Sequence, residues 1–315
     1  MMLFMNDHKI SDKLKTFLET NVLKTQIVGI KTLNRGGASL NYKISTNQCC
    51  YLLKIFDGSK VKRAERFLLI YQNISGVPNL SVPNLSFNRF FSFDDHILFL
   101  MDFVEGRKLE PSDLTASVLS QISDNYKIFL SAHFDDTRFI REKLDLEDLF
   151  LRTKQTLDDI ASSSLFCFYH TKILSALHKI YQNLPKLEQN PVVVHGDTGP
   201  NNFILNKKGK LFFLDFEMVR YGYLSEDLAQ FILSVLLQHR IWFFDKKKFI
   251  SSVRFFNDAL KLSREEWIYG ICLYFLRLAE RRSKTKILRS PRKSWLFYKH
   301  LSKFDKVMNA LLDCF

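Results

Sequence analysis

Two polar segments of the chain combine side chains whose spacing suits chemistry on a phosphate group. The first segment runs from His195 to Asn202 and places Asp197 five residues before Asn202. The second segment begins at Asp215, thirteen residues after Asn202 and at the end of an apolar run. An amide and a carboxylate supply the hard oxygen ligands that Mg²⁺ prefers when it is held together with substrate phosphates. Asp197, just ahead of them, could orient or deprotonate an attacking hydroxyl.

The spacing also predicts how these side chains come together. Phe203–Leu205 and Leu211–Leu214 have the pattern of short strands joined by a turn at Asn206–Gly209. Folding at this turn would place Asn202 and Asp215 nearly opposite each other. Each residue alone is equally typical of an ordinary turn or strand end. The complete pattern is far more specific, because it matches the catalytic and metal-binding segments of kinases.

A second set of residues, in the first hundred, could bind the phosphates of a nucleotide. Asn34–Asn41 is a glycine-containing loop whose backbone N–H groups could lie over phosphates, although such loops are also common hairpin turns. Lys54 follows an apolar stretch in a predicted strand, which is an unusual place for a lysine. Glu65 lies at the edge of the apolar stripe of a helix predicted from about Ser59 to Asn73. The stripe consists of Val61, Ala64, Leu68 and Tyr71. A strand lysine and a helix glutamate form the ion pair that positions ATP phosphates in kinases; an ordinary surface pair is the alternative.

The elements that would position these residues divide the chain in two. The first part is β-rich, with strands predicted at Val28–Leu33, Tyr42–Thr46, Cys49–Phe56 and His96–Val104. Beyond Gly106 the pattern is mainly helical, and short β-runs return only around Val192–Leu214. The sequence therefore predicts an α+β, bilobal fold, with a β-rich N-terminal lobe at 1–105 and a mainly helical C-terminal lobe at 106–315.

These segments resemble the aminoglycoside phosphotransferase and choline kinase superfamily, small-molecule kinases that share the protein-kinase-like fold. The resemblance rests on H-G-D-x-x-x-x-N at 195–202 and on D-F-E at 215–217. It extends to Ser225–Ala229 and to Phe99–Gly106, which resembles the interlobe hinge, and it spans about residues 25–230. It implies a nucleotide-binding first lobe and a second lobe that carries the catalytic and acceptor-binding residues.

The resemblance implies an ATP- and Mg²⁺-dependent kinase that phosphorylates a hydroxyl group of a small molecule. It makes Asp197 the catalytic base, and Asn202 and Asp215 ligands of Mg²⁺. Glu217 would lie near the metal and the phosphates as a further metal-site residue. Asp227 would brace the catalytic loop rather than touch the substrate.

The resemblance also implies the nucleotide-binding residues. Lys54, paired with Glu65, would hold the ATP phosphates. The other implied residues are the loop residues Gly37, Ser39 and Asn41 and, through their backbone at the adenine edge, Asp102 and Val104. One departure is Asn201, where many relatives have Gly. Because Asn tolerates left-handed backbone conformations, we expect the turn to be preserved and the enzyme to be active.

The distribution of charge along the chain limits which classes of molecule it is expected to bind. The chain has a formal net charge of +13, and residues 228–315 hold 18 Lys and Arg against 7 Asp and Glu. The density of basic residues is greatest at Arg277–Lys293. A nucleic-acid partner is not expected, because no nucleic-acid-reading motif accompanies the charge. In the family the acceptor site is built largely from the helices that follow the metal-binding Asp, so this basic segment would repel a polycationic aminoglycoside.

We therefore expect the acceptor to be a choline-like amino alcohol or a sugar rather than an aminoglycoside. The basic surface would also tolerate a neutral or anionic acceptor such as a phosphorylated intermediate. The alternative function is a non-catalytic, kinase-like protein whose basic C-terminal surface binds polyanions. The cysteines show neither zinc-site spacing nor a disulfide framework, and no signal peptide or bilayer-spanning run is present, so the expected location is the cytoplasm.

Overall fold

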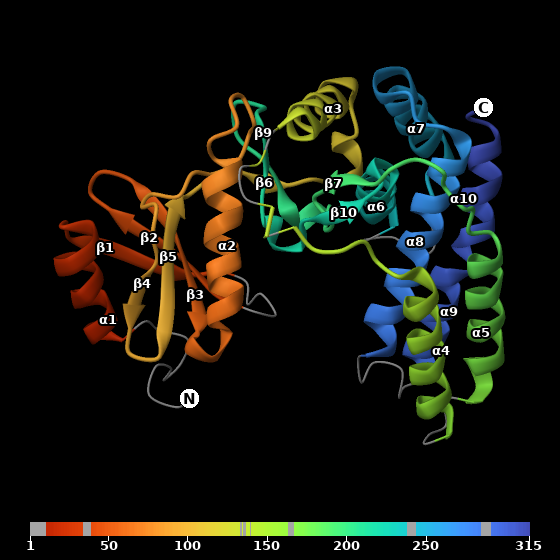
Figure 1. Ribbon diagram of the computed structural model, residues 1–315, viewed down its shortest axis with the longest axis horizontal. Helices are drawn as coiled ribbons and strands as arrows, with labels where there is room; N and C mark the ends of the chain where they lie inside the picture. The colour runs from red at the N-terminus through yellow and green to blue at the C-terminus, as the bar shows by residue number, and fades with distance from the viewer. Residues whose placement is uncertain are drawn as a thin grey trace. The chain divides into compact units, whose positions relative to one another are not determined.

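The computed structural model describes residues 11–315 except 34–38, 133, 135–136, 139, 163–166, 238–243 and 285–290. The chain forms two compact units. Unit 1 contains the described residues of 1–107, 132–139 and 206–217, and unit 2 contains those of 108–131, 140–205 and 218–315. The N-terminal region is rich in strands and the C-terminal part is mainly helical, which confirms the predicted fold class (Figure 1).

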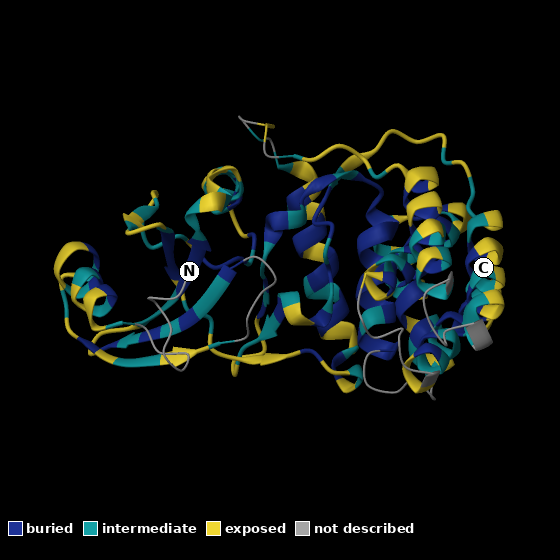
Figure 2. Cartoon of the chain, turned by 90° about the horizontal axis from the view of Figure 1, so that it is seen from below, coloured by how far each residue is buried: buried dark blue, intermediate teal, exposed yellow. Residues whose placement is uncertain are grey.

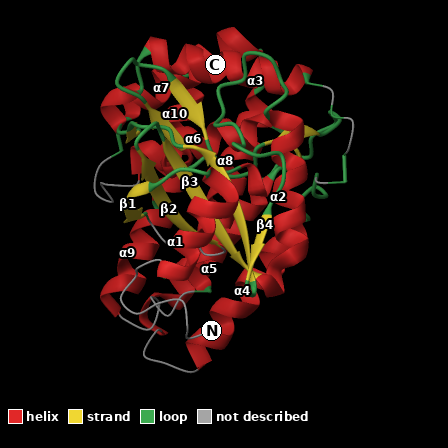
Figure 3. Ribbon diagram, turned by 90° about the vertical axis from the view of Figure 1, so that its left-hand side faces the viewer, coloured by secondary structure: helices red, strands yellow, loops and turns green. Residues whose placement is uncertain are grey.

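Unit 1 is built on a five-stranded antiparallel sheet, whose strands are among those drawn in yellow in Figure 3. The strand order is β1-β2-β3-β5-β4, with the bounds Ile27–Thr32, Ser39–Thr46, Cys50–Asp57, His96–Asp102 and Phe91–Phe93. Tyr42 and Ile44 of β2 are buried, as expected where alternate residues of a strand face the core. The register places Lys54 of β3 beside Asn41 of β2 and Phe99 of β5. Lys54 therefore lies on a central strand of the sheet.

Helix α2 (Val61–Ile74) packs against β3 (Figure 1). The Asp57 side chain accepts a hydrogen bond from the Ser59 N–H and caps a short 3₁₀ turn at Gly58–Lys60, which leads into the helix. The chain in unit 1 also forms α1 (Asp12–Phe17), a π-helical turn at Leu18–Leu23 and the short strand β9 (Leu211–Phe213). The Phe213 N–H donates a hydrogen bond to the Ser81 carbonyl oxygen at 2.8 Å, so the segment at 206–217 is tied to unit 1.

An aromatic cluster fixes the rotation of α2 about its axis. Phe67 packs against Phe56, Phe99 and Tyr71, with ring centroids 4.6–5.7 Å apart. The buried face of the helix is Ala64, Phe67, Ile70, Tyr71 and Ile74. The predicted stripe included Val61, which is exposed in the structure. The stripe was therefore wrong at its first position, because the large aromatic rings rather than Val61 pack on the sheet.

Unit 2 is mainly helical. Its helices are α3 (Ala116–Ser131), α4 (Leu146–Ser162), α5 (Cys167–Gln182), α6 (Leu224–Leu237), α7 (Lys246–Leu260), α8 (Arg264–Ser283), α9 (Pro291–Leu301) and α10 (Lys303–Leu312). Further short strands among the described residues are β6 (Arg107–Lys108), β7 (Val192–Val194), β8 (Phe203–Leu205) and β10 (Arg220–Gly222). Among the residues that the structure describes, no helix is both long enough and apolar enough to cross a membrane.

Helices α6 and α8 pack closely in unit 2, and nearly every residue of α6 is buried (dark blue in Figure 2 marks the buried residues). Gly270 of α8 permits this approach. A Cβ atom at this position would overlap the backbone carbonyl of Ser225, which cannot move away as a flexible side chain could. The two helices are important for the site because α6 and α8 carry several of its polar side chains.

Replacing Gly270 with alanine should lower the free energy of unfolding by about 1–3 kcal/mol, the range typical of overpacking a well-packed core. Thermal unfolding of the variant measures this effect. The matched control is Gly76→Ala, where the nearest atoms lie 3.8 Å from the added Cβ and the change should stay within about 0.5 kcal/mol. Equal stability of the two variants would show that the helices do not pack as closely as described.

Candidate active site

In unit 2, Asp227 at the start of α6 holds the loop that follows β7. Its two carboxylate oxygens accept hydrogen bonds from the His195 N–H at 2.7 Å and the Gly196 N–H at 2.9 Å. Gly196 has a φ of 80°, and a Cβ atom there would overlap the carbonyl oxygen of Met218. The expected bracing role of Asp227 is confirmed. The loop therefore presents the next residue, Asp197, in a fixed position.

Asp197 lies at the centre of a cluster of hydrogen bonds. Its Oδ1 accepts hydrogen bonds from Gln230 Nε2 at 2.7 Å and from Arg281 NH2 at 3.0 Å, and its Oδ2 accepts one from Asn202 Nδ2 at 3.2 Å. Burial raises the pKa of Asp197, but Arg281, Arg277, His195 and the hydrogen bond from Gln230 together lower it by more, and the net pKa lies below its ordinary value. The side chain is 31% exposed. Asp197 is thus an accessible, ionised carboxylate, which can orient a hydroxyl group and accept its proton.

Asn202 is oriented by the same aspartate. It ends a 3₁₀ turn at Pro200–Asn202, and its side-chain Nδ2 also donates to the main-chain oxygen of Asp197 at 2.7 Å. Because the NH₂ group is directed at Asp197, the amide oxygen is the atom suited to a metal ion. The neighbouring Asn201 lies in the same turn without a positive φ, so the left-handed conformation considered for it is not used.

In unit 1, Lys54 is the centre of a second charged cluster. Its Nζ pairs with Asp215 Oδ1 at 3.3 Å and makes a closer contact with Glu217 Oε1. Glu217 Oε2 accepts hydrogen bonds from Arg63 Nε at 2.8 Å and NH2 at 2.6 Å. Lys54 Nζ also lies 4.6 Å from the centre of the Phe67 ring. The buried lysine is therefore paired with two carboxylates, as a buried charge must be.

Glu65, the predicted partner of Lys54, does not take part in this cluster. Its side chain is exposed, and the α2 residue that reaches the cluster is Arg63. The predicted Lys54–Glu65 ion pair is therefore wrong. The physical reason is the rotation of α2 set by its aromatic residues, together with a buried glutamate, Glu217, that supplies the negative charge.

Two neutral replacements on α2 test whether Arg63 or Glu65 belongs to the charged cluster around Lys54. Arg63→Gln should lower the free energy of unfolding by about 1 kcal/mol, because Glu217 loses a charge-assisted partner that is itself partly exposed. Glu65→Gln should leave stability within about 0.5 kcal/mol, because the side chain is exposed. Urea unfolding of both variants measures the difference. A larger loss of unfolding free energy in Glu65→Gln than in Arg63→Gln would instead support the predicted Lys54–Glu65 ion pair.

The two acidic residues near Lys54 differ in their fitness as metal ligands. Burial raises the pKa of Glu217, but Lys54 and Arg63 lower it to about 2, and cations engage both of its oxygens. Glu217 therefore fits the role of an anchor for Lys54 better than that of a metal ligand. Asp215 has a left-handed backbone with φ of 58° and a side chain that is 46% exposed. Its Oδ1 contacts Lys54, and its carboxylate can still offer Oδ2 to a metal ion.

A divalent ion would depend on the substrate for some of its ligands. Within the described part of the chain, no three His, Cys, Asp or Glu side chains group into a metal-binding cluster. Mg²⁺ is commonly held by one or two protein oxygens together with nucleotide phosphates and water. Asn202 in unit 2 and Asp215 in unit 1 each carry an oxygen of the kind that such a site uses.

The other predicted nucleotide-binding residues are distributed along unit 1. Gly37 lies outside the described residues, and Ser39 and Asn41 lie in the first half of β2. Asp102 ends β5, and its N–H donates a hydrogen bond to the Asn84 carbonyl oxygen at 2.9 Å. An adenine edge would therefore use the Asp102 carbonyl oxygen rather than its N–H, together with the backbone of Val104. The roles of these residues stay predictions.

The residues that surround Asp197 and Lys54 were not predicted from the sequence. Arg277 and Arg281 are four residues apart on α8 and so share one face of the helix. The basic segment was recognised as a whole, but its members that face Asp197 were not. Gln230 stands three residues after Asp227 on α6, a spacing that could have indicated it. For Arg63 no pattern gave a signal, because its role depends on the rotation of α2.

Comparisons with known proteins show to which family the chain belongs. A model of the phosphotransferase enzyme family matches residues 29–246. Comparison with curated protein sequences finds no significant match. Similar solved structures include a spectinomycin phosphotransferase in complex with ADP and spectinomycin, with a TM-score of 0.67 and 11% identity over 96% of this chain and 97% of that one.

Two further structures show the same fold. An aminoglycoside phosphotransferase with bound ADP has a TM-score of 0.63 and 14% identity over 96% of this chain and 99% of that one. An aminoglycoside phosphotransferase from Alicyclobacillus acidocaldarius has a TM-score of 0.64 and 13% identity over 98% and 96%. With the family model covering more than half of its length, the chain belongs to the phosphotransferase enzyme family, whose members transfer phosphate to hydroxyl groups of small molecules.

Proposed function

We propose that this phosphotransferase is an ATP- and Mg²⁺-dependent kinase that transfers the γ-phosphoryl group of ATP to a hydroxyl of a small molecule in the cytoplasm. The observation that carries the proposal is the state of Asp197. It is ionised and oriented by Gln230, Arg281 and Asn202, and it is partly exposed on a loop that Asp227 holds in place. A carboxylate in this state suits the acceptance of a proton from a substrate hydroxyl.

In this proposal, each unit would contribute one group of residues to the reaction. In unit 2, Asp197 would align the acceptor hydroxyl and take its proton as the oxygen attacks. In unit 1, Lys54 would hold the phosphates of the nucleotide, and Glu217 would keep the buried ammonium group in place. Asn202 and Asp215 would be the metal ligands. Bound Mg²⁺ would neutralise charge on the β- and γ-phosphates.

The proposal that the chain binds ATP is supported by the family to which it belongs and by the similar solved structures. Two of the similar structures carry ADP. We assign the adenine edge to the backbone of Asp102 and Val104 and the phosphate loop to the segment that includes Gly37, Ser39 and Asn41. The contacts of Lys54 with two carboxylates support a phosphate site. They keep the buried ammonium group paired when no nucleotide is bound, and the group can turn to an incoming phosphate.

The alternative of a non-catalytic polyanion-binding protein is less well supported. It requires the basic segment to present an exposed stripe of charge away from the catalytic loop. Instead, Arg277 and Arg281 are in contact with the groups that surround Asp197. These arginines therefore belong to the catalytic region rather than to a separate surface.

An ATP-consumption screen tests the proposal. Wild-type protein with Mg²⁺ and ATP is offered amino alcohols, sugars, sugar phosphates, nucleosides and aminoglycosides, and ADP is measured. Acceptor-dependent ADP formation that disappears on chelation of Mg²⁺ is the expected result. Protein that neither binds ATP nor consumes it with any acceptor class would contradict the proposed function.

A further inference from the structure

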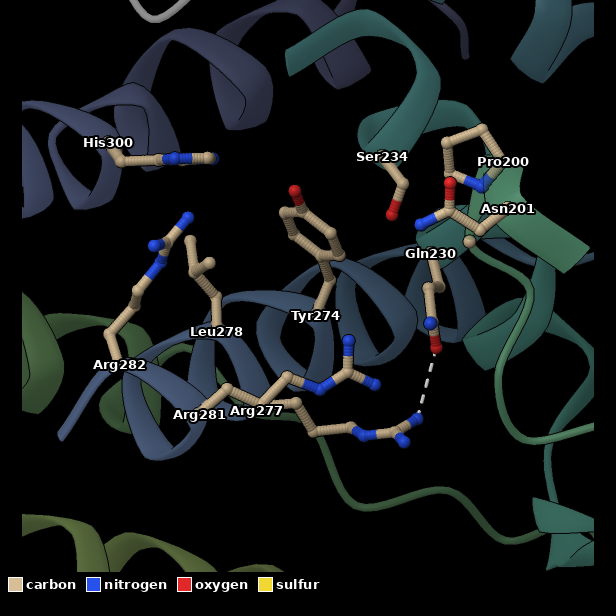
Figure 4. Close-up of a pocket in the computed structure, with 11 residues that line it drawn as sticks. Pro200, Asn201, Gln230, Ser234, Tyr274, Arg277, Leu278, Arg281, Arg282 and His300 are labelled. Atoms are coloured by element: carbon tan, nitrogen blue, oxygen red, sulfur yellow. Dashed lines mark hydrogen bonds between the residues drawn. The ribbon is translucent and has the colours of Figure 1, made fainter. Parts of the chain in front are cut away.

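A cavity of about 230 Å³ lies in unit 2 directly beside the catalytic loop. Gly199, Pro200 and Asn201, which separate Asp197 from Asn202 in sequence, form part of its wall. Helices α6, α8 and α9 supply the rest, as Figure 4 shows. Its volume is below the roughly 300–1,000 Å³ typical of clefts for drug-sized ligands. The cavity therefore suits a small metabolite rather than a bulky oligosaccharide.

The charge of this cavity is strongly one-sided. Three arginines on two successive turns of α8 line it, namely Arg277, Arg281 and Arg282, and no acidic residue is among the described residues of its wall. Asp197 offsets part of this charge through its bond to Arg281. Glu280, the acidic residue between these arginines in sequence, is paired with Lys284 instead. The cavity is therefore a region of positive potential next to the reacting group.

The arginine nearest the loop is held in place rather than free to swing away. Arg277 NH1 donates hydrogen bonds to the Gly196 carbonyl oxygen at 2.8 Å and to Gln230 Oε1 at 3.0 Å; the dashed line in Figure 4 marks the second bond. Burial and the neighbouring Arg220 and Arg281 lower the pKa of Arg277 to about 10, which leaves it charged at neutral pH. A fixed guanidinium group is suited to bind a planar or tetrahedral oxyanion.

A buried polar atom on the opposite wall offers a ligand a further polar contact. Figure 4 shows the His300 ring of α9 extending toward the space lined by Tyr274 and Arg282. His300 Nε2 is buried without a hydrogen-bond partner among the described residues. A buried polar atom without a partner is costly unless a ligand or water supplies one. His300 thus provides a polar contact that the protein itself leaves unsatisfied.

From this arrangement we infer that the acceptor is a small anionic alcohol, whose phosphate or carboxylate group binds among Arg277, Arg281 and Arg282 while its hydroxyl faces Asp197. This inference rests on the proposed kinase function and specifies its substrate class. A cationic acceptor, such as choline or an aminoglycoside, would place its charge against these three arginines. A neutral sugar would bring no negative charge to the positive potential of the three arginines.

Matched acceptors test the inference. Each set contains one alcohol in neutral, phosphate and carboxylate forms: glycerol, glycerol 3-phosphate and glycerate, or glucose, glucose 6-phosphate and gluconate. Choline and kanamycin supply the cationic arm. We expect kcat/KM for the better anionic form to exceed that of the neutral form by at least about tenfold, as a charged hydrogen bond predicts. The preferred anion distinguishes a phosphate from a carboxylate. Higher kcat/KM for a neutral or cationic acceptor would overturn the inference while leaving the kinase function intact.

Variants on α8 test where the phosphate or carboxylate group of the acceptor binds. Arg282→Glu should raise KM for the anionic acceptor at least about tenfold and change kcat little, because Arg282 lines the cavity without contacting Asp197 in the observed bonds. Arg282→Lys should restore part of the affinity. The matched control is Arg264→Glu, which reverses an exposed charge at the other end of the same helix and should leave KM unchanged. Equal KM values for Arg282→Glu and wild type would contradict the assigned site.

A binding measurement separates failure of this inference from failure of the proposed function. Thermal unfolding is followed with glycerol 3-phosphate, glycerate, glycerol or choline present and no nucleotide. Stabilisation by an anion that Arg282→Glu abolishes and Arg264→Glu preserves supports the anion site, even if no transfer from ATP is found. Transfer from ATP to some acceptor without any stabilisation by either anion supports the kinase and overturns the anion site.

Discussion

Asp197→Asn should lower kcat by about 10²–10⁴-fold, the usual contribution of a positioned acid or base. The asparagine keeps the size of the side chain, and its single amide oxygen can still accept the hydrogen bond that Gln230 donates to Oδ1, whereas the bond from Asn202 to Oδ2 is lost. It removes the negative charge that accepts the proton of the hydroxyl. Affinity for ATP, measured by titration with a non-hydrolysable analogue, should change by less than about threefold, because Lys54 and the rest of unit 1 are untouched.

The control for this variant is Asp124→Asn, an exposed aspartate on α3. It removes one negative charge from unit 2 without touching the loop and should keep wild-type turnover. If Asp197→Asn turned over ATP at the wild-type rate with the same acceptor, Asp197 would not be the base. Loss of activity with unfolding would be visible in thermal melts, in which case Asp197→Glu serves as a second variant that keeps the charge.

The second large effect is expected at Lys54. Lys54→Met should reduce kcat/KM for ATP by about 10²–10³-fold, the scale found when a group that stabilises developing charge is removed. The methionine keeps the packing of the aliphatic stem near Phe67 but leaves the carboxylates of Asp215 and Glu217 without their shared ammonium group. Arg63 still pairs with Glu217, which limits the loss of folding stability.

The matched control is Lys31→Met, on β1 of the same sheet, where the lysine is exposed. This replacement should leave both turnover and ATP affinity unchanged. Lys54→Arg keeps the charge and should recover part of the ATP affinity. A Lys54→Met protein that binds and uses ATP like the wild type would assign phosphate binding to other residues.

The sequence predicted the parts of the site that are local. Asp197 and Asn202 lie within one recognisable motif, whose spacing sets most of their geometry, and Asp227 lies in a second short segment that the resemblance also covers. Strands were predictable near Phe203–Leu205 and Leu211–Leu214 because a turn with Gly209 separates two apolar runs; the positive φ of Gly209 is the conformation such a turn requires.

The sequence did not predict contacts that depend on the rotation of a helix. Glu65 was chosen because it is acidic and lies near the expected stripe of α2. The packing of Phe67 and Tyr71 turns this residue to solvent and brings Arg63 to Glu217 instead. Such a rotation of roughly one residue changes every polar partner of a helix, and charge pattern alone does not determine it. The same limit applied to α8, where the basic composition was evident but the face holding Arg277 and Arg281 was not.

The most direct test of the central claim follows the phosphoryl group itself. Wild-type protein, ATP, Mg²⁺ and the best acceptor of the screen are observed by phosphorus NMR, with Asp197→Asn as the control. The kinase assignment predicts loss of the γ-phosphate signal and growth of an equal amount of a new phosphate monoester in the wild type, with neither change in the variant. Release of inorganic phosphate without a monoester, or the same monoester formed at an unchanged rate by Asp197→Asn, would contradict it.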